Sequence, residues 1–388
     1  MLIFFVILAV LMTILFGTSY WLTGFVWESS GRKRVRTLLL VLDGLMLAGV
    51  LIGPKFLRDV SWGGTAIAFF SIILMTQFFF CVLVLGALGF RRIRRLLSTK
   101  TPVDYERRRL ILGHAMIYPL ISFAAGTYGG VWERNETVVN SYDIPVKNLP
   151  AAFQGFSIAQ ISDVHLGMFF SLERLRDLLA QIAELKPDVL AITGDIFDNA
   201  QMTPEAVRIV DSFADAFPKG IWYCHGNHEH HRGIDLVERC LKDTRIHVLV
   251  NQSETVLDKE RPLVFVGVDY PMGVMGEAFQ AKKKSFMDQA MEGVPENAVC
   301  ILLAHHPEYI DNAAEYGVPL TLTGHTHGGQ VGIFGIPIFP IFKYTRGMVR
   351  TGDCLGYVHV GNGSWFPYRF GCPPEIALFR LKDSGNHE

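Results

Sequence analysis

Apolar residues follow two different patterns along this chain of 388 residues. The first 131 residues contain four long apolar stretches, at about residues 1–27, 37–54, 64–90 and 110–131. Each stretch approaches the roughly 20 residues that an α-helix needs to cross a bilayer. We therefore predict an all-α membrane domain of about four transmembrane helices over residues 1–131.

Two of these stretches admit another interpretation. A cleavable signal peptide is the alternative for residues 1–27, but this apolar run is too long and no positively charged segment precedes it. Asp43 interrupts residues 37–54, and a charged group at membrane depth is costly unless it is paired or faces protein. The second stretch is therefore predicted to be a helix packed against a partner, or one that inserts poorly.

Basic residues predict the orientation, since Lys and Arg in short loops stay in the cytoplasm. The loop at residues 91–109 holds eight of them, whereas the loops at residues 32–36 and 55–58 hold four and two. If the loop at 91–109 is cytoplasmic, the span at 110–131 carries the rest of the chain outward. We expect a multi-pass protein of the cell (inner) membrane whose C-terminal part is extracytoplasmic.

After residue 131 the pattern changes to short apolar runs and amphipathic segments. A polar, turn-rich linker at residues 132–150 precedes residues 151–388, in which strands and helices alternate. A helix is predicted at residues 171–186, opened by Ser171 and closed before Pro187, and a second one from Thr203. Buried strands are predicted at residues 156–161, 188–192, 221–224, 298–303 and 319–322. This alternation indicates an α/β domain.

Each predicted strand runs directly into a cluster of polar residues. The clusters are Asp163-x-His165, Gly194-Asp195-x-x-Asp198, Gly226-Asn227-His228-Glu229, His305, and Gly324-His325-x-His327. Open α/β sheets bind ligands at the carboxyl ends of their strands, so the five clusters are expected to converge on one crevice. Their mixture of carboxylate, imidazole and amide suits Mn, Fe, Zn or Ni better than calcium. We predict a hydrolytic site that holds two divalent metal ions.

Charge and cysteine content narrow the classes of partner. Residues 1–131 carry a net charge of about +9 and the remainder about −10, although the whole chain carries −1. The acidic part lacks the clustered positive charge that phosphate contacts require, which argues against nucleic acid as a partner. The six cysteines show no metal-binding spacing, and the sequence leaves open one disulfide among Cys240, Cys354 and Cys372.

Over about residues 150–380 the ordered motifs D-x-H, G-D-x-x-D, G-N-H-E, a lone His and G-H-x-H resemble the calcineurin-like metallophosphoesterase superfamily. The hydrophobic N-terminal segments are similar to those of its bacterial membrane-associated branch. The resemblance implies a four-layer αββα sandwich with a dinuclear centre at one edge of the sheets. It implies that Asp163, His165 and His327 bind one metal ion, that Asn227, His305 and His325 bind the other, and that Asp195 bridges both. His228 is then the catalytic histidine. Asp198 and Glu229 orient the ligands.

Two positions at which this chain differs from part of that superfamily limit the class of substrate. Its protein Ser/Thr phosphatases have Arg where this chain has Asn199 and His225, which disfavours a phosphoprotein. His225, together with His230 and His231, is left without a ligand role. His306 is likewise set aside, because the family pattern places the ligand first in the His-x-Pro sequence.

The predicted reaction is hydrolysis of a phosphodiester or pyrophosphate by attack of a metal-bridging hydroxide. His228 would stabilise charge on the phosphoryl oxygens or give a proton to the departing oxygen. A lipid or lipid-linked envelope intermediate, or a small phosphoester, is the expected substrate, and the bilayer is the expected partner. The alternative is a membrane receptor or binding module with an inactive phosphoesterase domain, against which the intact ligand set argues.

Three further segments have two interpretations each. Residues 331–342 form either an apolar lip for a lipid or strand and core packing. Residues 270–293 form either a lid or a solvated helix that packs its own apolar side. Arg346 and Arg369 are candidates for contacts to substrate phosphate or for surface salt bridges, and no substrate-binding residue is assigned.

Overall fold

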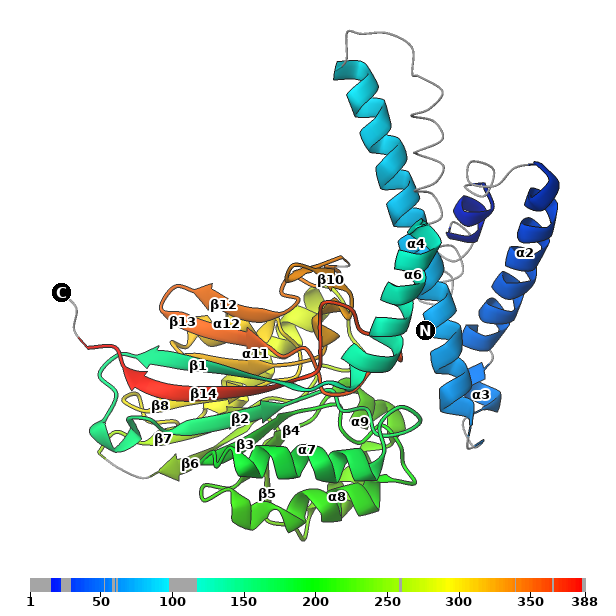
Figure 1. Ribbon diagram of the computed structural model, residues 1–388. Helices are drawn as coiled ribbons and strands as arrows, with labels where there is room; N and C mark the ends of the chain where they lie inside the picture. The colour runs from blue at the N-terminus through cyan, green and yellow to red at the C-terminus, as the bar shows by residue number, and fades with distance from the viewer. Residues whose placement is uncertain are drawn as a thin grey trace. The chain divides into compact units, whose positions relative to one another are not determined.

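The computed structural model describes residues 15–21, 29–51, 53–57, 60, 62–97, 117–257, 260–338, 340–364 and 366–385 (Figure 1). The chain divides into two compact units. A helical unit comprises Met1–Glu133 together with Phe366–Phe370, and an α/β unit comprises Arg134–Trp365 and Gly371–Glu388.

The helical unit contains α2 (Ser29–Leu51), α3 (Gly53–Phe56), α4 (Gly63–Leu97) and α6 (Ile117–Thr127). Within the described residues, one stretch, Gly63–Phe90 of α4, is long and apolar enough to cross a bilayer, by length and composition. The predicted stretch 37–54 falls largely in α2, whose first turns are basic and which contains Asp43. The predicted spans at 1–27 and 110–131 lie partly outside the described residues. Among the described residues the structure therefore contains one candidate span, and the four predicted spans are not confirmed.

Asp43 lies in protein surroundings in this unit. Its side chain is buried, and Gln77 of α4 donates from Nε2 to Asp43 Oδ1 over 2.5 Å. A buried carboxyl group needs such a partner, because desolvation without a hydrogen bond is costly. Of the two alternatives for this stretch, a helix packed against a partner and one that inserts poorly, the contact agrees with the first.

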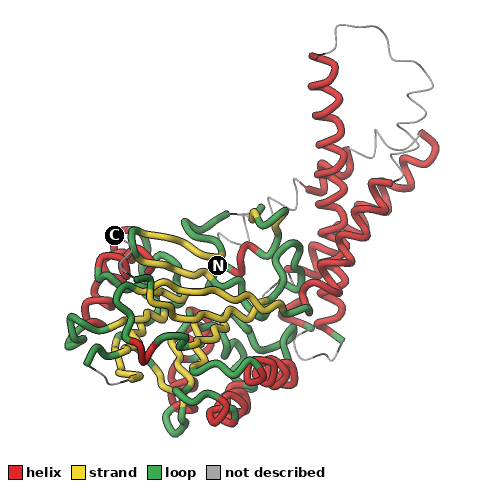
Figure 2. Tube along the Cα trace, turned by 60° about the vertical axis from the view of Figure 1, so that its left-hand side comes forward, coloured by secondary structure: helices red, strands yellow, loops and turns green. Residues whose placement is uncertain are grey.

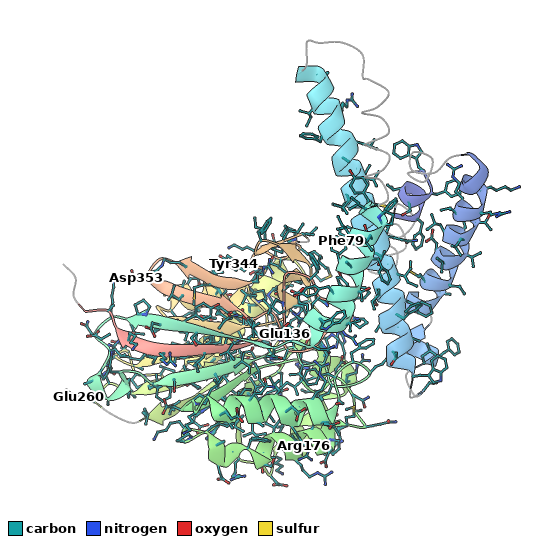
Figure 3. All side chains as sticks on the ribbon, in the orientation of Figure 1. Phe79, Glu136, Arg176, Glu260, Tyr344 and Asp353 are labelled. Carbon is teal, nitrogen blue, oxygen red and sulfur yellow. The ribbon has the colours of Figure 1, made fainter. Side chains whose placement is uncertain are left out.

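A short segment from the C-terminal part of the chain, Phe366–Phe370, packs with the helices. Tyr368 donates its hydroxyl hydrogen to the carbonyl of Ala125 over 2.9 Å. The ring of Phe370 lies 4.7 Å from that of Phe79, which Figure 3 labels on α4. No pattern in the sequence indicated this return of the chain to the helical unit.

The α/β unit contains two six-stranded mixed sheets and a two-stranded hairpin, seen as the yellow strands of Figure 2. The first sheet has the order β1-β14-β2-β3-β4-β5 and the second the order β12-β13-β9-β8-β7-β6. The strands are β1 (Val138–Val146), β2 (Ser157–Ile161), β3 (Val189–Thr193), β4 (Ile221–Cys224), β5 (Ile246–Val248), β6 (Gln252–Leu257), β7 (Leu263–Gly267), β8 (Val299–Leu303), β9 (Leu320–Thr323), β10 (Gly332–Ile333), β11 (Ile336–Pro337), β12 (Gly347–Thr351), β13 (Cys354–Val358) and β14 (Glu375–Asp383).

Helices cover both outer faces of this pair of sheets. They are α7 (Leu172–Glu184), α8 (Thr203–Ser212), α9 (Asn227–Arg232), α10 (Ile234–Leu241), α11 (Glu277–Met291) and α12 (Tyr309–Glu315). One apolar core joins the first sheet to α7, α8 and α10, a second fills the space between the sheets, and a third joins the second sheet to α11 and α12. The layers therefore run helix, sheet, sheet, helix, the arrangement that the resemblance implies.

The five predicted strands and the two predicted helices are confirmed to within about two residues. The Ser171 hydroxyl caps α7 by accepting from the backbone N–H of Arg174 over 3.2 Å. However, β2, β3 and β4 belong to the first sheet and β8 and β9 to the second, so the clusters come from two sheets instead of one. The segment predicted as a linker, 132–150, contains β1, which pairs in parallel with β14.

The segment 270–293 forms α11 and packs its apolar side onto the second sheet. Met287 and Ala290 are fully buried in the third core. Lys283 of α11 is also buried, with its Nζ 3.5 Å from a carboxylate oxygen of Glu308. All six cysteines, each within the described part of the chain, are free.

Candidate metal centre

The predicted ligands lie in the turns that follow β2, β3, β4, β8 and β9. In each sheet the strands concerned run parallel, so their carboxyl ends meet at one edge. Five of these residues adopt left-handed backbone conformations: Asp163 (φ 52°), His165 (φ 49°), Asp195 (φ 55°), His325 (φ 75°) and His327 (φ 52°). Residues other than glycine rarely hold positive φ, and such strain clusters at functional sites.

One group of ligands consists of Asp163, His165 and His327, all of them buried. The Nε2 atoms of the two histidines face each other at 2.9 Å. Asp163 Oδ1 lies 3.5 Å from Nε2 of His327 and 3.9 Å from Nε2 of His165. Metal–ligand bonds of about 2.0–2.2 Å place the ligands of a tetrahedral ion about 3.3 Å apart, so this spacing fits a shared cation.

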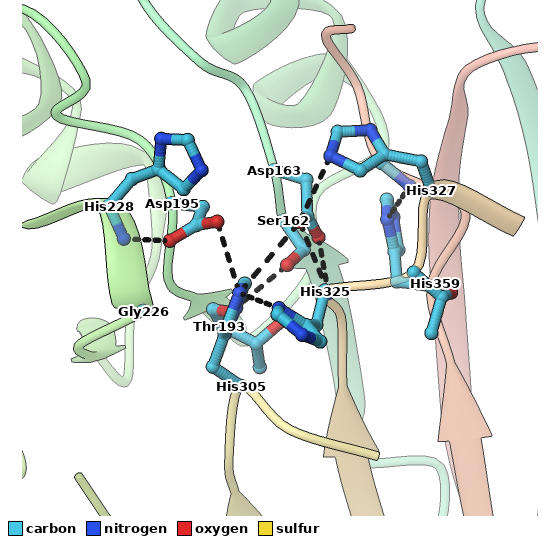
Figure 4. Close-up of polar contacts among 12 residues, drawn as sticks. Ser162, Asp163, Thr193, Asp195, Gly226, His228, His305, His325, His327 and His359 are labelled. Carbon is cyan, nitrogen blue, oxygen red and sulfur yellow. Dashed lines mark hydrogen bonds and ion pairs between the residues drawn. The ribbon is translucent and has the colours of Figure 1, made fainter. Parts of the chain in front are cut away.

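A second group consists of Asp195, His305 and His325. Nε2 of His305 lies 3.1 Å from Asp195 Oδ2 and 3.2 Å from Nδ1 of His325. The other ring nitrogen of His305, Nδ1, is 2.7 Å from the carbonyl oxygen of Thr193, to which it can only donate. Nε2 is therefore the ring nitrogen that a metal ion beside Asp195 would bind. Figure 4 shows these side chains turned toward one another.

Asp195 lies between the two groups. Its Oδ2 is 3.1 Å from His305 Nε2 and 3.7 Å from His165 Nε2, while Oδ1 accepts from the backbone N–H of His228 over 2.8 Å. Burial alone would raise the pKa of Asp195, but the imidazoles of His305, His165 and His228 hold it well below its usual value. The carboxylate therefore stays ionised in a position from which it reaches ligands of both groups.

Asn227 is the first residue of α9 and has the amide expected of a ligand. Its Oδ1 is buried and has no hydrogen-bond partner among the residues that the structure describes. A buried carbonyl oxygen without a partner is costly, whereas a cation would satisfy it. The preceding Gly226 is required because a Cβ there would collide with Asp195 Oδ1. The donor set therefore fits the two divalent cations that the sequence predicts.

Asp198 connects the predicted catalytic histidine to a predicted ligand. Its Oδ1 lies 2.9 Å from Nδ1 of His228 and its Oδ2 lies 3.1 Å from Nδ1 of His165. Burial would lower the pKa of His228, but its contact with Asp198 raises it above the usual value. The side chain of His228 is 27% exposed and that of His165 only 3%, so His228 is the histidine of this pair that a substrate can reach.

Glu229 is fully buried and contacts backbone instead of ligand side chains. Its two carboxylate oxygens accept from the N–H groups of Asp195, Ile196, Phe197 and Gly226 at 2.8–3.0 Å. The interaction holds the turn after β3 against the turn after β4. Glu229 therefore positions Asp195 and Asn227 through the main chain.

An aromatic wall, formed by Tyr270, Phe279 and Phe342, borders the group of His305 and His325. The ring of Phe342 is 5.1 Å from that of His325, and the ring of Tyr270 is 5.4 Å from it. Phe279 lies 4.9 Å from His306, whose pKa burial lowers to about 4. His306 Nδ1 accepts from the backbone N–H of Glu308, so the geometry favours His305 over His306 as the ligand.

The two arginines considered for phosphate contact have other surroundings. Arg346 donates from Nη1 to the carbonyl of Gly371 over 2.9 Å. Arg369 is fully buried and lies in the segment that groups with the helical unit. Neither observation supports a role in binding substrate phosphate.

Sequence analysis missed a third group of potential ligands, formed by His225, His230 and Asp269. Asp269 was not considered because the strand before it, β7, was not predicted. The apolar run Leu263–Gly267 followed by an acidic residue is the same signal that the other strands carry. It was the one cue that could have revealed the residue.

These features define a metal-dependent phosphoesterase domain of the calcineurin-like class. The family described as calcineurin-like phosphoesterase matches residues 156–329, and the chain carries a domain of this family. This match and the similarity to a relative named as a phosphodiesterase support a metal-dependent phosphoester hydrolase.

Three relatives illustrate the similarity. The chain is 29% identical over 270 residues to the uncharacterized metallophosphoesterase YkuE of Bacillus subtilis (strain 168). The aligned region covers 67% of this chain and 92% of that protein. It is 26% identical over 322 residues to the Danio rerio protein named transmembrane protein with metallophosphoesterase domain, covering 79% and 70%. It is 29% identical over 235 residues to phosphodiesterase YaeI of Escherichia coli (strain K12), covering 58% and 82%.

Proposed function

We propose that this chain hydrolyses a phosphodiester or pyrophosphate bond at a centre of two divalent cations. The position of Asp195 carries the proposal, because its carboxylate lies between an imidazole of each ligand group. Asp163, His165 and His327 would hold one ion, and Asn227, His305 and His325 the other. Two ions so held would neutralise phosphate charge and lower the pKa of a bound water.

His228 is proposed as the residue that acts on the departing oxygen. Its contact with Asp198 favours the protonated imidazole, which can donate a hydrogen bond or a proton. The backbone N–H of His228 is meanwhile fixed to Asp195 Oδ1. The main chain of the histidine is therefore fixed to Asp195, while its side chain is 27% exposed and open to a substrate.

A lipid or lipid-linked phosphate is the proposed substrate. Near Phe342 of the aromatic wall in the sequence lie three apolar residues with large exposed fractions, which we call the apolar rim: Phe334 (99%), Ile336 (71%) and Ile341 (83%). Among the large apolar residues of 331–342 that the structure describes, only Val331 is buried, so core packing does not account for the exposed ones. Contiguous exposed apolar surface marks contact with a membrane, a ligand or a partner protein, and an acyl chain suits a rim beside a phosphate-binding centre.

The proposed location is the cell (inner) membrane, with several spans and an extracytoplasmic catalytic domain. The span candidate in α4 and the similarity to a protein named as transmembrane support membrane attachment. The predicted loop at residues 91–109 begins with the last turns of α4, which ends at Leu97, and the eight basic residues of this segment support the orientation. The bilayer is the proposed partner, and the acidic charge after residue 131 disfavours nucleic acid.

Replacement of Asp195 by Asn tests the function. We expect hydrolysis of a generic aryl phosphodiester to fall by at least about 1,000-fold, since several kcal/mol of charge stabilisation would be lost. Asp353→Asn is the matched control, because Asp353 pairs with Lys147 on the surface. Near-normal turnover by the Asp195→Asn variant would refute the centre and leave the alternative of a membrane receptor with an inactive domain.

The lipid proposal has its own test. Purified protein is assayed against phospholipids, nucleotide-linked lipids and soluble diesters, and the phosphorus-containing product is identified. We expect a lipid-linked diester or pyrophosphate to be the best substrate. Equal or better hydrolysis of every soluble diester would remove the lipid from the proposal without affecting the metal centre.

A further inference from the structure

His225, His230 and Asp269 bring three potential ligand atoms together at a place that the proposed reaction does not use. The residues come from three elements: His225 follows β4, His230 lies in α9, and Asp269 follows β7. His225 Nδ1 is 3.5 Å from Asp269 Oδ1, and His230 Nε2 is 2.8 Å from the same oxygen. All three ligand atoms lie within 4.8 Å of one another.

The two ligand groups of the metal centre provide an internal standard for this spacing. There, neighbouring ligand atoms lie 2.9 Å apart between His165 and His327 and 3.1 Å apart between His305 and Asp195. The separations of 2.8 and 3.5 Å in the third group fall around the same values. Ligand atoms bound to an ion at about 2.0–2.2 Å lie about 2.8–3.6 Å apart for bond angles between about 90° and 109°, so these separations fit a shared ion.

Hydrogen bonds within the group explain only part of why these three side chains lie together. His230 can donate to Asp269 at 2.8 Å, and the backbone N–H of Tyr270 donates to the same oxygen. His225 is fully buried, yet neither of its ring nitrogens has a hydrogen-bond partner in the part of the chain that the structure describes. A buried imidazole left in that state is costly, whereas binding of a cation by Nδ1 would satisfy that nitrogen.

We propose that His225, His230 and Asp269 bind a third divalent cation of the zinc class. Two imidazoles and one carboxylate are a donor set that suits zinc and leaves a fourth position for water. The side chains of His230 and Asp269 are 19% and 16% exposed, so that position has access to solvent.

The third ion would have a positioning role. It would tie β4 of the first sheet to β7 of the second and to α9, the helix that begins with Asn227 and carries His228. A cross-link at this point holds the two sheets together where their strand ends form the metal centre. The inference does not depend on which phosphoester is hydrolysed.

The test is the number of metal ions bound by the full-length chain after zinc loading and gel filtration, measured by mass spectrometry of the metal. The readout is the difference between the natural chain and His230→Gln, which we expect to be about one ion per chain. This difference does not depend on how many ions the Asp195 centre holds. His231→Gln, which alters the neighbouring exposed histidine of α9, should bind as many ions as the natural chain.

Two further variants separate loss of the ion from loss of the fold. Asp269→Asn keeps an oxygen that accepts from His230 and from the backbone of Tyr270, and it should also lose about one ion. His230→Cys supplies a thiolate that zinc accepts, and it should regain the ion. Equal metal content in the natural chain, His230→Gln and Asp269→Asn, with all three folded by circular dichroism, would overturn the proposal.

Discussion

At the floor of the metal centre Asp163, Asp195 and His305 are at most 2% exposed, whereas at the apolar rim Phe334 and Ile336 are 99% and 71% exposed. The floor contains buried ionisable groups, and neighbouring groups of opposite charge offset the cost of burying each of them. The rim exposes apolar side chains to solvent. Burying charge and exposing apolar surface are both unfavourable, so each region indicates a ligand that would relieve the cost.

The buried charges of the floor are stabilised by neighbouring charges, whereas the exposed side chains of the rim are not part of such a network. This difference predicts how each region responds to substitution of a residue. Burial would lower the pKa of His305, but Asp195 and Asp163 raise it to about 10, so removal of one member alters the others. On the rim, one side chain can be replaced without disturbing a network. Changes at the floor should therefore be large and general, and changes at the rim small and specific to the substrate.

The largest effect should come from removing the metal ions. Dialysis against a strong chelator should lower hydrolysis of an aryl phosphodiester by at least about 1,000-fold, because the charge stabilisation by the ions is lost. Adding back manganese, zinc, iron or nickel singly should restore activity to different extents and identify the preferred ion. Full activity in a chain shown to be free of metal would contradict the role of the floor.

Replacement of Glu229 by Gln should destabilise the fold of the α/β unit. The carboxylate accepts from four backbone N–H groups, and an amide would direct its own donor at some of them. We expect the free energy of unfolding to fall by about 3 kcal/mol, measured by denaturant titration. Glu205→Gln, which alters an exposed pair with Arg176, should change it by less than about 1 kcal/mol.

Replacement of Asp198 by Asn should lower kcat/KM by about 10- to 100-fold, as for other partners of metal-binding histidines. It should also move the alkaline limb of the pH–rate profile. Burial lowers the pKa of His228 and Asp198 raises it, so removing the carboxylate lets that pKa fall. If protonated His228 is the active form, activity is lost as pH rises through its pKa, and the limb moves to lower pH.

The pH profile of the Asp198→Asn variant separates the two roles of this residue. An unchanged alkaline limb with lower activity would mean that Asp198 does not act through the protonation of His228 but through its other partners, His165 and Arg232. Asp215→Asn serves as the control, since Asp215 pairs with exposed Arg245 and should leave the profile as it was.

The smallest effect should follow replacement of Phe334 by Ser on the rim. We expect kcat/KM to fall by about 10-fold for a lipid phosphodiester presented in vesicles, the loss of part of one apolar side chain's transfer free energy. Hydrolysis of a soluble aryl phosphodiester should not change. Met275→Ser is the matched control, because Met275 is apolar, 87% exposed and outside the rim. Equal losses for both substrates would argue against lipid contact at Phe334.

Local pattern was sufficient for the elements that lead into the site. Apolar runs bounded by turns predicted β2, β3, β4, β8 and β9, and the Ser171 cap and the leucine spacing predicted α7. The polar residues that follow those strands are the ones that the structure brings together. Local rules are sufficient here because burial and the turn after each strand are encoded within a few residues.

Partners distant in sequence were not visible in the same way. The local pattern of β1 predicts a linker, because its exposed and buried positions depend on pairing with β14, which lies more than 200 residues away. The sequence does not indicate a ligand role for Asp269 for a similar reason, because His225 and His230 come close to it only when the two sheets pack together. The return of Phe366–Phe370 to the helical unit is also set by packing and not by any local motif.

For this protein, residue order alone determined which side chains can bind cations and that each is placed at the end of a buried strand. Short-range steric and hydrophobic preferences are enough for that. The family resemblance added two sheets and a bridging role for Asp195, and only the tertiary structure decided which strands form each sheet and the distances at which Asp195 faces an imidazole of each group. The tertiary structure also decided which histidines are left over to form a third group with Asp269, because such juxtapositions depend on distances across the fold that no local pattern contains.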